Sequence, residues 1–179
     1  MFRNLPPVTK NLLLINIICF LADMVFSRYG VNLSHILGLH YVTASEFGFW
    51  QPITYMFMHA NFSHLFFNMF AVLMFAPAIE ARWGSRRFLI YYLVTGIGAG
   101  IIQEIVWALQ LQPVLNSVDP LMAAQLANRV VTIGASGAVF GILLAFGWLF
   151  PDVRMYILFI PVPIRARTLV IIYALIELF

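Results

Sequence analysis

The stretch Gly134-Ala135-Ser136-Gly137, continued by Ala138-Val139-Phe140-Gly141, places a serine hydroxyl at the start of an apolar run that reaches Phe150. A polar group in hydrocarbon costs free energy, so a serine at this place needs a reason. The flanking glycines allow another helix to approach closely. Two interpretations are therefore open: the stretch is a helix-packing seam, or Ser136 is a reactive group.

The composition indicates a membrane protein. Of 179 residues, 63% are hydrophobic and 9% are charged, and the mean hydropathy is +0.93. Soluble domains carry about 25% charged residues, and a soluble fold of this size could not hide so much apolar surface. The net charge of +3 gives no indication of nucleic-acid binding. The single cysteine, Cys19, cannot form an internal disulfide.

Five apolar runs are separated by polar or basic segments, and we predict that they are membrane spans. They cover residues 11–26, 64–81, 88–111, 134–150 and 168–179. The fifth would form only about 18 Å of helix against a hydrocarbon core of about 30 Å. We therefore expect this span to be incomplete and to continue beyond Phe179. The predicted fold is an all-α polytopic membrane protein with one transmembrane domain over residues 1–179.

Two connections carry additional features. Residues 27–63 are too polar for a span and too aromatic for a solvated loop, so we predict a loop embedded in the membrane interface. Residues 112–132 form a polar connection with a short helix expected near 121–128. The polar residues Asn16 and Asp23 of the first span are expected to face the bundle.

The distribution of basic residues predicts the orientation. Two basic residues, Arg28 and Arg129, fall on one side of the predicted topology and eight on the other. The positive-inside rule then places the N-terminus and these eight in the cytoplasm: Arg3, Lys10, Arg82, Arg86, Arg87, Arg154, Arg165 and Arg167.

Three polar residues are expected to converge near the opposite face. His64 and Asn68 are four residues apart and share one side of a helix, at a depth similar to that of Ser136. Their side chains and the backbone N–H of Ser136 could donate to a developing oxyanion. This is the chemistry of acyl transfer by a serine nucleophile. For a lone serine beside glycines, simple helix packing would be the better interpretation.

The sequence alone does not decide which histidine, if any, is the general base. All four (His35, His40, His59 and His64) precede Ser136. His64 could act as the base only if its ring reaches Ser136, and His59 only from a mobile loop. We expect no metal site at His59 and His64, because five-residue spacing does not share a helix face and no Cys or Asp completes a ligand set.

The motifs, in their order, resemble those of the rhomboid intramembrane serine proteases. Gly134-Ala135-Ser136-Gly137 is similar to the Gly-x-Ser-Gly motif of that family, and His64-x-x-x-Asn68 to its second motif. Glu80-x-Arg82-x-Gly84-Ser85 resembles the segment that closes the second helix. Trp50-Gln51 stands where many members carry Trp-Arg, so the arginine is replaced here.

The resemblance implies a function and roles for these residues. Ser136 would be the nucleophile, and His64, Asn68 and the Ser136 N–H would form the oxyanion hole. Substrates would be transmembrane proteins cut near the membrane surface, without a cofactor or a metal. The protein would be a multi-pass protein of the lipid bilayer, in the cell (inner) membrane.

One departure from the family affects this expectation. The family base is a histidine on a sixth span, which this sequence does not contain. We therefore expect these 179 residues to be inactive as they stand, with Gly134, Gly137 and Gly141 at a seam against the absent helix. The alternative is a non-catalytic rhomboid-like protein that binds transmembrane clients. A channel or transporter would need internal repeats, and none is visible.

Overall fold

The computed structural model describes residues 5–156 and 163–178. Within them, three helices are long and apolar enough to cross a membrane: α1 (Pro7–Ser27), α4 (Phe62–Trp83) and α5 (Ser85–Gln110). Each contains or closely matches one of the first three predicted spans. The prediction of a helical membrane protein is confirmed at this level. Arg3 and Phe179, which entered the charge pattern and the fifth run, lie outside the described residues.

Shorter elements connect these helices. Between α1 and α4 lie α2 (Leu33–Leu37), β1 (Leu39–His40), α3 (Gln51–Thr54) and the 3-10 helix η2 (Tyr55–Phe57). After α5 come α6 (Gln112–Leu115), α7 (Pro120–Arg129) and β2 (Val131–Thr132). The chain then forms α8 (Ser136–Leu149), β3 (Arg154–Tyr156), β4 (Pro163–Arg165) and α9 (Ala166–Leu178).

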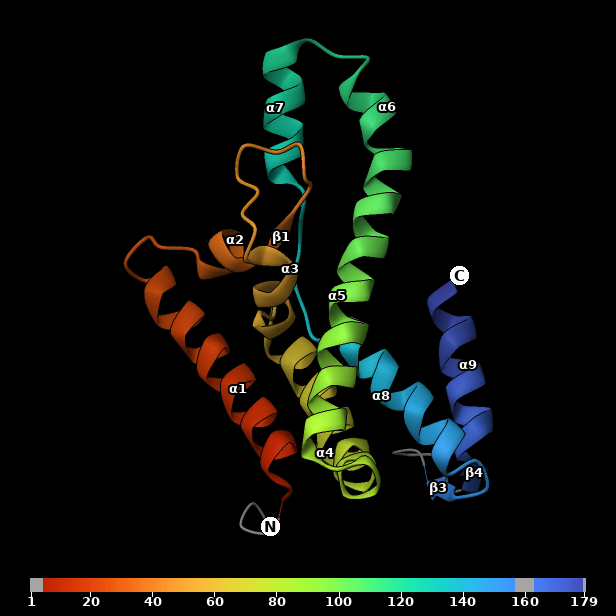
Figure 1. Ribbon diagram of the computed structural model, residues 1–179. Coiled ribbons are helices and arrows are strands. Elements are labelled where there is room, and N and C mark those ends of the chain that lie inside the picture. Colours follow the sequence, from red (N-terminus) through yellow and green to blue (C-terminus); the bar gives the residue numbers. More distant parts are fainter. Residues whose placement is uncertain (1–4, 157–162, 179) are drawn as a thin grey trace.

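Helix α8 is the central element, and it is shorter than the predicted span 134–150. It packs against α4, α5 and α9, and most of its residues are buried. A helix that is apolar all round is expected in a protein core or in a membrane, and α8 is enclosed by these three helices. Its 14 residues give about 21 Å of helix, less than the hydrocarbon thickness. Figure 1 shows that α8 begins beside α5, partway along that helix.

The glycine seam of α8 faces α5. A Cβ at Gly141 would lie 2.6 Å from Thr95 Oγ1, and a Cβ at Gly137 would collide with Ala99. Thr95 and Ala99 are four residues apart on one face of α5, so the small residues of both helices meet. Within the described residues, Gly137 and Gly141 thus pack against α5; packing of the seam against a further helix stays a prediction.

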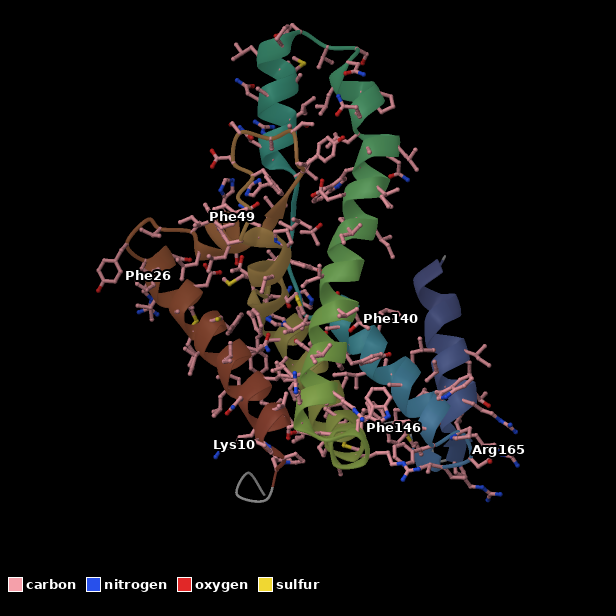
Figure 2. The ribbon with its side chains drawn as sticks, in the orientation of Figure 1. Lys10, Phe26, Phe49, Phe140, Phe146 and Arg165 are labelled. Carbon is pink, nitrogen blue, oxygen red and sulfur yellow. The ribbon has the colours of Figure 1, made fainter. Side chains whose placement is uncertain are left out.

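The bundle is tied together near its basic end. Lys10 and Arg165 lie at the same end of the molecule (Figure 2). There Glu80 of α4 is buried and accepts hydrogen bonds from the first turn of α1: from Val8 N–H at 2.9 Å and Thr9 N–H at 2.8 Å. A carboxylate at a helix N-terminus is favoured by the helix dipole. Farther along α1, Asn16 is fully buried, as predicted.

The predicted interface loop is built as a folded unit rather than an irregular connection. Its β1 strand pairs antiparallel with β2, with Leu39 opposite Thr132 and His40 opposite Val131. Gln51 is buried, accepts from His40 N–H and donates to the carbonyls of Ile36 and Glu46. The uncharged Gln51 thus holds three backbone segments of the loop together.

Candidate functional site

The N-terminus of α4 presents His64 and Asn68. Asn61 caps this helix by accepting the backbone N–H of His64 at 2.8 Å, which fixes the first turn. His64 is half-buried and Asn68 is buried. The Asn68 amide donates to the His64 carbonyl at 3.1 Å within the helix. The two residues share one face, as their spacing predicted.

The segment before α8 is held by the interface loop. The N–H of Gly134 donates to the carbonyl of Tyr55 at 2.9 Å, and the preceding strand β2 pairs with β1. Burial raises the pKa of Tyr55 to about 12, so its hydroxyl stays protonated and donates to the carbonyl of Gly96 at 2.6 Å. These contacts fix Gly134, and the residues that follow it, relative to η2 and α5.

Gly134 brings His64 and Ser136 together. Its φ of +134° disfavours a side chain, and a Cβ there would lie 2.8 Å from both Nε2 and Cε1 of His64. The same point lies 3.7 Å from Ser136 Oγ. The His64 ring therefore occupies the space that a side chain at Gly134 would need, next to the serine hydroxyl. Close backbone approach of this kind is the physical reason for a glycine.

Ser136 begins α8 with free polar groups. It is exposed, and within the described residues its hydroxyl takes part in no hydrogen bond. Within the same residues, no side chain caps the first turn of α8, whose first helical bond is donated by Val139 to the Ala135 carbonyl. The N–H groups of this first turn are available to an electron-rich ligand, and the helix dipole favours negative charge there.

A cleft of about 1130 Å³ opens between α4, α8 and α9. The N-termini of α4 and α8 contribute polar groups at one end of the cleft. Apolar side chains of α4, α8 and α9 line the rest of it. The polar lining residues at that end are Asn61, Ser63, His64, Asn68 and Ser136. The structure thus places the three residues singled out by the sequence in one cleft.

His59 lies much closer to the site than the sequence suggested. The sequence leaves His59 a role as base only from a mobile loop, yet its side chain is 1% exposed and its ring meets that of His64 edge-on, with centroids 5.0 Å apart. Both ring nitrogens are buried and unpaired within the described part of the chain. Burial, followed by the neighbouring His64, lowers the pKa of His59 to about 4. A neutral imidazole thus packs behind His64.

Metal ligation is a separate question. Across residues 5–156 and 163–178, no group of three His, Cys, Asp or Glu side chains is arranged to hold a metal ion. His35 and His40 instead form a local contact in the interface loop, where His40 is fully buried and its Nε2 lies 2.7 Å from the His35 carbonyl.

Comparison with known proteins adds an independent finding. The family model of the Rhomboid domain matches residues 46–179. The rhomboid protease AarA of Providencia stuartii is 31% identical over 143 residues, which cover 77% of this chain and 49% of AarA. The chloroplastic Rhomboid-like protein 11 of Arabidopsis thaliana is 30% identical over 132 residues, 73% of this chain and 38% of that protein.

A third relative comes from a mitochondrion. The Rhomboid protein 1 of Saccharomyces cerevisiae is 31% identical over 107 residues, 60% of this chain and 27% of that protein. The matched stretch covers under half the length of each of these three relatives. Together with the apolar helices, the matched domain makes the chain an integral membrane protein, and the chain belongs to the rhomboid family.

Proposed function

We propose that the chain carries the catalytic core of an intramembrane serine endopeptidase that cleaves transmembrane proteins near the membrane surface. Ser136 is the nucleophile in this proposal. The observation that carries it is that the His64 ring and the Ser136 hydroxyl both lie beside the Cβ position of Gly134 and line the same largely apolar cleft. A substrate helix could unwind there with its scissile carbonyl at the serine.

The proposed chemistry is acyl transfer. Ser136 Oγ attacks the scissile carbonyl carbon, the π electrons move to the carbonyl oxygen, and the hydroxyl proton passes to a general base. The oxyanion would be stabilised by the N–H of Ser136 at the start of α8 and by the side chains of His64 and Asn68. The proton then goes to the leaving amine, and water hydrolyses the acyl-enzyme.

The general base in this proposal comes from outside these 179 residues. All four histidines precede Ser136, and in the described residues neither His59 nor His64 hydrogen-bonds to the serine hydroxyl. The resemblance to the family leads us to expect the base on a sixth span. We accordingly propose that residues 1–179 alone do not cleave substrate.

A second candidate is a rhomboid-like protein that binds transmembrane clients without cleaving them. One observation favours it: the Asn68 amide donates to the His64 carbonyl, so one of its two N–H donors is engaged within α4. A binder would retain the cleft but would need neither an activated serine nor an oxyanion hole.

Active-site labelling separates the two candidates. In the full-length protein, a fluorophosphonate probe is expected to label Ser136, and Ser136→Ala should abolish labelling and substrate cleavage. Ser63→Ala is the matched control, because Ser63 lines the same cleft and its hydroxyl donates to Asn61. Cleavage that persists in Ser136→Ala would refute the assignment, whereas client binding without any labelling would support the binder.

A further inference from the structure

The end of the cleft away from Ser136 is basic. Ser136 begins α8, and Arg154 of β3, just beyond the other end of that helix, also lines the cleft. Arg154 is exposed and, within residues 5–156 and 163–178, forms no ion pair. The cleft therefore runs along α8 from the serine to an exposed guanidinium group.

The cationic charge around Arg154 exceeds the anionic charge. Arg165 and Arg167 share one carboxylate, that of Asp152, at 3.7 Å and 3.9 Å, and all three side chains are about half exposed or more. Arg165 lies opposite Arg154 in the β3–β4 pair. Exposed ion pairs of this length contribute little, so these arginines can turn to another anion. Three arginines against one aspartate leave a net positive site.

The wall between the two ends is apolar and open. Phe67 and Met74 of α4 line it and are 67% and 54% exposed. Because α4 is long and apolar enough to span the membrane, hydrocarbon chains are the natural material against this surface. Leu143 of α8 and Leu169 of α9 complete the wall.

We propose that an anionic phospholipid occupies this cleft, with its acyl chains along Phe67, Met74 and Leu143 and its headgroup phosphate on Arg154. A guanidinium group matches phosphate with two parallel hydrogen bonds. Basic pockets between transmembrane helices bind anionic headgroups in this way. The excess positive charge at β3 and β4 selects a headgroup with net negative charge over a zwitterionic one. This binding site does not depend on the proposed catalysis.

Lipid titration of the full chain in detergent, followed by native mass spectrometry, tests the site. Phosphatidylglycerol should bind more tightly than phosphatidylcholine, and Arg154→Gln should weaken phosphatidylglycerol binding by about fivefold. Arg87→Gln is the matched control, since Arg87 is an exposed arginine in the first turn of α5 that does not line the cleft. Its affinity should stay within about twofold of that of the unmodified chain.

A second pair of variants tests the apolar wall. Met74→Trp should fill the cleft and reduce the binding of both lipids, whereas Ile101→Trp, at a similarly exposed apolar position of α5, should not. The proposal is overturned if Arg154→Gln binds phosphatidylglycerol as the unmodified chain does, or if Arg87→Gln loses as much affinity. Equal binding of the two lipids, or Met74→Trp with unchanged lipid binding, would also overturn it.

Discussion

Gly134 is the residue on which the site geometry depends most directly. An added Cβ would meet the His64 ring at 2.8 Å, and the φ of +134° is strained for any side chain. We expect Gly134→Ala to lower the free energy of unfolding by more than about 1 kcal/mol and to abolish serine labelling in the full-length protein. Thermal melting in detergent and fluorophosphonate labelling measure the two effects.

Gly98 of α5 provides the matched control for Gly134. A Cβ at Gly98 would have no atom within 4 Å among the described residues. Gly98→Ala should therefore raise stability by roughly 0.5–1 kcal/mol, because alanine favours a helix, and it should leave labelling unchanged. Equal melting temperatures for Gly134→Ala and Gly98→Ala would contradict the geometry at Gly134.

His59 gives the fold a pH dependence with a defined sign. Its pKa is about 4 in the folded protein, against about 6.5 when unfolded. Above about pH 6.5 the imidazole is neutral in both states. Between pH 6.5 and about 4 only the unfolded chain takes up the proton, so stability falls by up to about 1.4 kcal/mol per pH unit.

Melting temperatures at pH 7.5, 6 and 5 measure this contribution of His59. The unmodified protein should lose stability toward pH 5, and His59→Gln should lose clearly less, because the buried titrating group is gone. His35→Gln is the control, since the half-buried His35 lies in the same loop region. If His59→Gln and the unmodified protein show the same pH slope, His59 does not cause it.

At the scale of elements, the sequence predicts well where helices occur, but it predicts poorly which helices pack against one another. Long apolar runs decide α1, α4 and α5, because only helices satisfy the backbone of a single segment in hydrocarbon. Helix α7 (Pro120–Arg129) also lies over the predicted 121–128, where Asp119 caps it. Local sequence patterns do not predict features that depend on residues far away in the chain. Three such features are the short length of α8, the burial of His59 and the contact of Gly137 with Ala99.

In the interface loop, too, the sequence does not predict the contacts between distant residues. Its aromatic and polar composition distinguishes it from a span, but composition says nothing about the β1–β2 pairing that fixes the segment before Gly134. The hydrogen bonds of Gln51 likewise join it to residues that lie 5 to 15 positions away and outside its own helix α3. The sequence therefore singled out Ser136, His64 and Asn68 as candidates, and the tertiary contacts show how the loop holds the segment that leads to Ser136.

Helix α7 is expected to order the loop through Asn128. Its amide donates to Ser45 Oγ at 2.9 Å, and its carbonyl oxygen accepts the N–H of Glu46 at 3.4 Å. We expect Asn128→Ala to speed amide exchange at residues 41–47 by about fivefold, as for the loss of about 1 kcal/mol. Hydrogen exchange with mass spectrometry measures it. Gln125→Ala, at an exposed position of α7, should leave the loop unchanged; equal exchange in both variants would argue against the link.

At the scale of the whole molecule, the distribution of basic residues and the length of α5 both distinguish the two ends of the molecule along the membrane normal. Helix α5 is about 39 Å long, which exceeds the hydrocarbon core, and Figure 1 shows α6 and α7 at the end of the molecule away from the α4–α5 turn. The basic residues Arg82, Arg86 and Arg87 surround that turn. From the positive-inside rule we propose that the turn lies in the cytoplasm and α7 on the opposite side.

Cysteine accessibility tests this orientation. In a Cys19→Ser background, which removes the single native cysteine, Gln125→Cys on α7 should react with a membrane-impermeant maleimide in intact bacterial spheroplasts. Arg86→Cys at the α4–α5 turn should react only after the membrane is opened. Both positions are exposed in the structure, so a difference between them reports the side of the membrane rather than burial. Labelling of Arg86→Cys in intact spheroplasts, with Gln125→Cys protected, would reverse the proposed orientation and place the mouth of the cleft at Ser136 toward the cytoplasm.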